Sequence, residues 1–68
     1  MRTVSISGDV SIGHTWVREQ LSGQKIEGIV GIQLTIEAGK DLQCDLMIKT
    51  DDGIHHERVE VNYLSLQK

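Results

Sequence analysis

The sequence predicts a mainly β fold: a small antiparallel sheet, or a partly open barrel or sandwich, of about five to six strands built from hairpins, with little or no helix. Apolar and polar residues alternate over most of the chain, which is the period of strands that bury one face. Seven glycines are spread along the sequence and proline is absent, so glycine supplies the turns and bulges. A length of 68 residues suits a single domain, residues 1–68.

The N-terminal residues predict a short leading hairpin. Val4 and Ile6 alternate with serines, Gly8-Asp9 has the composition of a turn, and residues 10–12 resume the same period.

Residues 11–21 are compatible with a helix or with a strand. Ser11, the first residue of this segment, could cap a helix, whereas the β-branched Thr15 and Val17 favour an extended chain. We predict a strand at Thr15–Leu21, and a tight turn at Ser22-Gly23 that joins it to a second strand at residues 24–29.

The clearest alternation lies at residues 30–37, where every even position is aliphatic, and it returns at residues 42–49. Gly39 between these segments suits a positive φ, so the pair predicts an antiparallel hairpin with one buried face. Gly28 and Gly31 predict a bulge or a bend where the first of these strands begins.

A further strand of the same sheet is predicted after the turn sequence Asp51-Asp52-Gly53. It covers residues 55–63, and strand periodicity places Val59, Val61 and Tyr63 on one side.

The charge balance argues against a nucleic-acid reader. Ten acidic residues outnumber seven basic ones, which gives a formal net charge of −3, and the basic residues are scattered along the chain. No apolar stretch is long enough to cross a bilayer, and the N-terminal segment lacks the apolar core of a signal peptide. We therefore expect no membrane association and a cytoplasmic location.

Self-association is expected from the composition. Cys44 is the only cysteine, so no disulfide forms within one chain, and its strand parity with Leu46 predicts a buried structural thiol in place of a catalytic nucleophile. The chain has no phenylalanine, one tryptophan and one tyrosine, so its core lacks the large rings that bury the most area. A single copy would be marginally stable, and uncovered strand edges are available for pairing in a homo-oligomer.

Trp16 is the most informative single residue, because a lone tryptophan either anchors a core or serves as an interface hot spot. The core role is slightly favoured. In the interface role His14 and Arg18 flank Trp16 on the same face of a strand, so these three residues are the expected partner-binding set. The basic residues available to bind phosphate are Arg18, Lys25, Lys49 and Arg58.

No motif in the sequence predicts a catalytic residue, a cofactor or a metal ligand set. His55 and Glu57 share one side of the expected strand and His56 points to the other, which leaves a metal site short of ligands. We expect these residues to form the solvated start of a strand.

The stretch Leu21–Gly39 has a polar hairpin turn, an aliphatic alternating strand and a glycine turn, and another strand follows it. In this layout residues 21–50 resemble small β-rich proteins of bacteriophages and prophages. The resemblance implies a phage origin for the chain, and no particular activity.

The function expected from these features is that of a non-catalytic, phage-type interaction protein. It would act as an oligomeric binding module that inhibits a host protein, such as a host-defence protein, or sequesters a small ligand. Its partners would be further copies of itself and a host or phage protein, in the host cell cytoplasm. One alternative is a structural component of a virion or of its assembly, and a weaker alternative is a metal-dependent enzyme.

Overall fold

A computed structural model describes residues 1–9 and 11–67. The described chain forms five strands in one open mixed sheet, together with a single turn of 3₁₀ helix. In chain order the elements are β1 (Thr3–Asp9), η1 (Ile12–His14), β2 (Thr15–Glu19), β3 (Ile29–Thr35), β4 (Gln43–Thr50) and β5 (Gly53–Gln67). The prediction of a mainly β fold is confirmed.

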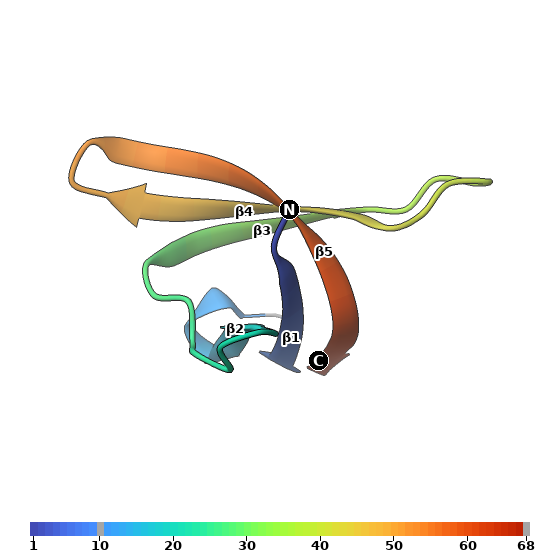
Figure 1. The fold of residues 1–68 in the computed structure, drawn as a ribbon, viewed down its shortest axis with the longest axis horizontal. Helices are drawn as coiled ribbons and strands as arrows, with labels where there is room; N and C mark the ends of the chain where they lie inside the picture. The colour runs from blue at the N-terminus through green and yellow to red at the C-terminus, as the bar shows by residue number, and fades with distance from the viewer. Residues whose placement is uncertain (10, 68) are drawn as a thin grey trace.

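The long strand β5 joins two halves of the sheet, whose strand order is β2-β1-β5-β4-β3. Residues 53–59 of β5 pair with β4, and residues 60–67 pair with β1. Figure 1 shows β5 running from the β3–β4 layer down to β1 and β2, so that the sheet bends over itself. The core lies inside this bend.

The core is small and aliphatic. Among the residues whose burial the structure describes, six side chains are buried; they come from β1, β2, β4 and β5, and none of them is aromatic. Partly buried aliphatic side chains, many of them from β3, pack against this cluster. The buried side chains are those of Val4, Ile6, Val17, Cys44, Leu46 and Val59.

The local predictions were confirmed best in the centre of the chain. β3 and β4 form the expected antiparallel hairpin, and β2 occupies the first part of the segment predicted as a strand. The turn at Ser22-Gly23 is present, with Gly23 at φ 69° and its N–H donating to the carbonyl of Glu19. The predicted bulge lies between Ile29 and Gly31, where the pairing with β4 shifts register.

The predicted leading hairpin was wrong. Gly8-Asp9 is no turn, because β1 continues through both residues. β1 pairs with β2, with Val4 opposite Glu19 at one end of the ladder and Gly8 opposite Thr15 at the other. The expected second arm begins at residue 10, which lies outside the described residues. Gly8 has φ 131°, a value that only glycine adopts without strain. The glycine is therefore required by the backbone conformation within β1, and the chain does not reverse direction there.

Residues 24–29 do not form the predicted full strand. Lys25 makes one antiparallel bridge with Arg18, and the flanking backbone bonds run from Glu19 N to Gln24 O and from Ile26 N to Val17 O. The chain then turns away at Gly28, whose φ is 81°. This short segment covers part of the outer edge of β2.

Strand pairing differs from the expected all-antiparallel sheet in one place, since β1 and β5 are parallel. The register of this pair shifts between Val4 and Ser5, which lie opposite Val61 and Tyr63. Asn62 therefore has no partner in the ladder, and the side of the sheet to which later residues point changes. The predicted common side for Val61 and Tyr63 was wrong for this reason.

Candidate binding face

One side of β2 displays the predicted partner-binding residues. Trp16 and Arg18 lie opposite Ser7 and Ser5 of β1, and both are exposed, while Val17 between them is buried. This arrangement is the two-residue period of a strand that buries one face. His14, in η1, precedes β2 and is exposed as well.

The same outer face continues across β1 onto the second half of β5. Ser5 lies opposite Tyr63, and Ser7 lies opposite Ser65. Trp16 is 43% exposed and Tyr63 is 57% exposed, so the favoured core role for the tryptophan was wrong. We call this surface the aromatic face; it consists of Trp16 on β2, Ser5 and Ser7 on β1, and Tyr63 and Ser65 on β5.

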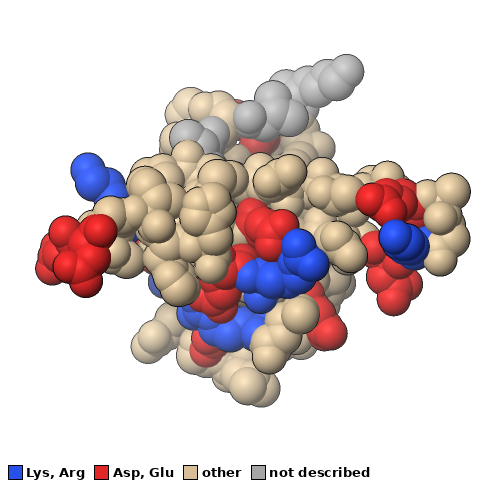
Figure 2. Space-filling model, turned by 90° about the horizontal axis from the view of Figure 1, so that it is seen from above, with Lys and Arg blue, Asp and Glu red and all other residues tan. Residues whose placement is uncertain are grey.

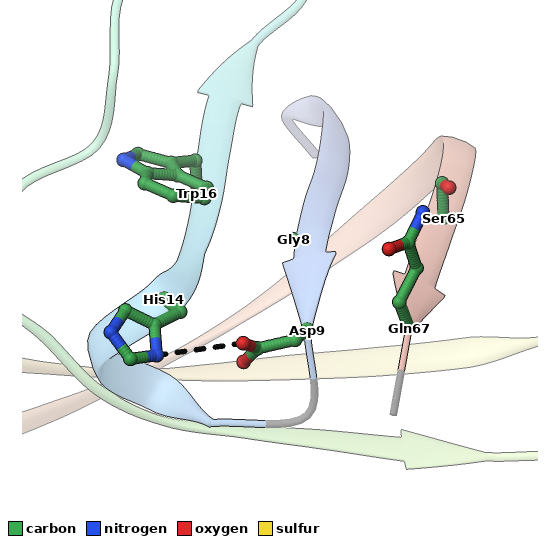
Figure 3. Close-up of a pocket in the computed structure, with 6 residues that line it drawn as sticks. All are labelled: Gly8, Asp9, His14, Trp16, Ser65 and Gln67. Carbon is green, nitrogen blue, oxygen red and sulfur yellow. Dashed lines mark ion pairs between the residues drawn. The ribbon is translucent and has the colours of Figure 1, made fainter.

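A shallow, open hollow of about 460 Å³ lies at one end of the aromatic face. Figure 3 shows its lining residues on three neighbouring strands, with β1 between β2 and β5, and in η1, which precedes β2. The Nδ1 atom of His14 is 3.4 Å from Oδ2 of Asp9, and the backbone N–H of Ser11 donates to Oδ1 of Asp9 at 2.8 Å. The lining residues are Gly8, Asp9, His14, Trp16, Ser65 and Gln67.

Arg18 and Lys25 bring two positive charges together at the other end of β2. They are direct partners in an antiparallel bridge, a geometry in which like charges repel. Arg18 Nη1 donates to the carbonyl oxygen of Gly23 at 3.1 Å, which draws its guanidinium toward the turn after β2. Neither side chain has an ion-pair partner within the described residues.

The other predicted phosphate-binding residues lie elsewhere. Arg58 donates to both carboxylate oxygens of Asp45, at 2.9 and 3.2 Å, and this contact lowers the pKa of Asp45 from its ordinary value. Lys49 lies near the end of β4, and its backbone N–H donates to the carbonyl of Gly28. On the face seen in Figure 2, acidic and basic side chains alternate without a continuous basic surface.

His55, His56 and Glu57 lie on the first half of β5, which pairs with β4. Glu57 lies opposite the buried Leu46 and accepts two hydrogen bonds from Arg2, which lower the pKa of its carboxyl group. His55 is opposite Ile48, and His56 is opposite Met47. The described residues contain no group of three or more metal-ligating side chains.

Cys44 is fully buried, as its parity with Leu46 predicted, and its thiol is free. Burial raises the pKa of its thiol, and the neighbouring Asp45 raises it further. A buried thiol with a raised pKa is a poor nucleophile, so Cys44 belongs to the core.

Sequence reasoning missed several residues of this site. Asp9, Ser65 and Gln67 carry no motif, because their proximity depends on the parallel pairing of β1 with β5. Tyr63 could have been found, since it is the only other aromatic residue of the chain. The contact of Arg2 with Glu57 gave no local signal either, because 55 positions separate the two residues.

Comparisons with protein families, curated proteins and solved structures found no match to this chain. The class of protein is therefore defined by its own architecture, an open mixed β-sheet with an exposed aromatic face. Among residues 1–9 and 11–67, no helix has the length and apolar character needed to cross a membrane.

Proposed function

We propose that this chain is a non-catalytic binding module that acts as a homo-oligomer. The observation that carries the proposal is the position of Trp16 and Tyr63, which lie exposed on the same outer face. Aromatic side chains contribute more buried area than any others, and tryptophan and tyrosine are enriched at the centres of interfaces. A protein that excludes both of its rings from a small core has them available for binding.

The proposed site of self-association is the second half of β5. Residues 60–67 pair with β1 on one edge, and within the described chain no strand pairs with their other edge. Leu64 and Leu66 on this half are 40% and 38% exposed. A β5 strand from a second copy would satisfy the open backbone groups and cover both leucines.

The residues of this edge lack two of the usual barriers to pairing. Proline and lysine, which keep exposed edges apart, are both absent from residues 60–67. A two-fold axis would bring identical edges together in antiparallel orientation and close the assembly as a dimer. We place this dimer in the cytoplasm, where the free thiol of Cys44 would stay reduced.

Light scattering coupled to size exclusion at micromolar concentration tests the proposed dimer. The expected mass is twice the 7.6 kDa of one chain. A double variant, Leu64→Lys with Leu66→Lys, should be a monomer, because two charges would be buried at the paired edge. Ile36→Lys is the matched control, since Ile36 is 81% exposed outside β5 and its variant should remain dimeric.

Two results would contradict the dimer: a strictly monomeric wild-type chain, or a double variant that keeps its mass. A ring or an open polymer would instead favour a structural assembly component, because repeated edge pairing builds such forms.

A further inference from the structure

The hollow beside Trp16 is a shallow, open depression of the surface. Its volume is about 460 Å³, and one side of a molecule bound there would stay in contact with solvent. Gly8 contributes no side chain to fill it. Trp16 of β2 lies on one side of β1, Ser65 and Gln67 of β5 lie on the other, and Asp9 of β1 and His14 of η1 complete the lining (Figure 3).

Trp16 supplies the apolar surface of the hollow. Its side chain is 43% exposed, and the face of an indole ring is electron-rich and attracts groups with partial positive charge. The C–H bonds on one face of a pyranose ring are such groups, while the hydroxyls of the same sugar project from its rim. The C–H face of a pyranose therefore suits the indole of Trp16, and its hydroxyls suit polar side chains beside the indole.

Asp9, Ser65 and Gln67 supply the polar groups. A carboxylate accepts hydrogen bonds, and a hydroxyl and an amide both donate and accept, which matches the mixed character of sugar hydroxyls. Asp9 is held in place by the N–H of Ser11 at 2.8 Å and by His14 at 3.4 Å. The side chains of Ser65 and Gln67 take no part in the side-chain hydrogen bonds within the described residues.

The charges around the hollow disfavour an anionic ligand. No lysine or arginine is among the described residues that line it, and the carboxylate of Asp9 would repel a phosphate group. Arg18 is the nearest cation along β2, and its guanidinium donates to the carbonyl of Gly23 at the opposite end of the strand.

We propose that this hollow binds a neutral saccharide, with one pyranose ring stacked on Trp16 and its hydroxyls bonded to Asp9, Ser65 and Gln67. This inference rests on the proposed binding function and names the chemical class of its ligand. A single ring of about 12 non-hydrogen atoms in an open site binds with a dissociation constant on the order of millimolar. Two such sites in a dimer bind a branched or repeating glycan more tightly than either site alone.

Fluorescence titration with methyl glycosides of glucose, galactose, mannose and N-acetylglucosamine tests the site. Trp16 is the only tryptophan of the chain, so its emission reports on this hollow alone. We expect a saturable change with at least one glycoside, and a loss of affinity of about tenfold or more in Gln67→Ala. Calorimetry should show that Trp16→Phe retains binding and that Trp16→Ala abolishes it.

Arg18→Gln is the matched control, because Arg18 shares the face of Trp16 but does not line the hollow. Its affinity for the glycoside should equal that of the wild type. The inference is overturned if no glycoside gives a saturable signal, if Trp16→Ala binds as tightly as the wild type, or if adenosine monophosphate binds in preference to every glycoside.

The mass measurement separates this inference from the proposed function. A dimer that binds no saccharide would overturn the ligand class and leave the oligomeric module intact. A monomer that binds a glycoside at Trp16 would uphold the ligand class and contradict the dimer.

Discussion

Arg2 and Glu57 form a two-point ion pair that joins the start of the chain to the first half of β5. Nε of Arg2 is 2.6 Å from Oε2 of Glu57, and Nη2 is 2.5 Å from Oε1. Nη1 of the same guanidinium is 3.4 Å from Oε2 of Glu19 at the end of β2. One arginine therefore ties together both halves of the bent sheet, with the paired geometry that makes arginine–carboxylate contacts strong.

The pH dependence of stability should reveal this pair. Arg2 holds the pKa of Glu57 below its ordinary value of 4.5, so the native state favours the charged carboxylate more than the unfolded chain does. The stabilisation is complete above pH 4.5 and is lost as the pH falls through the lower native pKa. Glu57→Gln should lower the free energy of unfolding at pH 7 by about 1 kcal/mol, a value reduced for partial solvent exposure.

Urea unfolding of the wild type and Glu57→Gln between pH 7 and pH 3 measures this effect. The two curves should converge toward the acidic end of the range. Glu60→Gln is the control on the same strand, because the described residues give Glu60 no ion-pair partner. A constant difference between Glu57→Gln and the wild type at every pH would contradict the assignment.

Loss of the aromatic side chains should cost little stability. Trp16 and Tyr63 are 43% and 57% exposed, whereas Leu46 is fully buried. Trp16→Ala and Tyr63→Ala should each lower the free energy of unfolding by less than about 1 kcal/mol, and Leu46→Ala by about 2–5 kcal/mol. Unfolding followed by circular dichroism at one fixed protein concentration compares the variants. Equal losses of unfolding free energy in Trp16→Ala and Leu46→Ala would show that Trp16 is part of the core.

Gly8 is a position where an added methyl group has no room. A Cβ atom there would lie 2.1 Å from the carbonyl oxygen of His14 and 2.8 Å from Cα of Thr15. With the additional strain of φ 131°, Gly8→Ala should cost about 3 kcal/mol or more. Gly13→Ala is the control, since its nearest neighbour, the Ser11 hydroxyl, would be 3.9 Å away. Thermal unfolding decides the matter, and similar melting temperatures for both variants would rule out the clash.

Cys44 should resist chemical modification in the folded protein. Its side chain is fully buried and its pKa is raised, so the thiolate is scarce and shielded. Reaction with an aromatic disulfide reagent near pH 8 should be at least about 100-fold slower than in denaturant, because it requires opening of the core. Rapid stoichiometric labelling under native conditions would show that the thiol is accessible.

Local sequence was sufficient for part of this fold. The hairpin of β3 and β4 was predicted because its two arms alternate and a glycine-containing loop joins them, so the signal and the contact lie in the same short segment. The burial of Cys44 and the shared face of Trp16 and Arg18 followed from strand periodicity in the same way.

The tertiary structure alone decided which distant strands meet. β1 pairs with β5 in parallel, and a register shift in this pair at Asn62 turns Tyr63 outward. Arg2 contacts Glu57. Each of these features depends on residues far apart in the chain. A segment's period specifies which side chains share a face, but the choice of partner strand and register depends on the packing energy of the whole sheet. For this reason alternation identified the strands, and only the folded chain showed which residues surround the hollow beside Trp16.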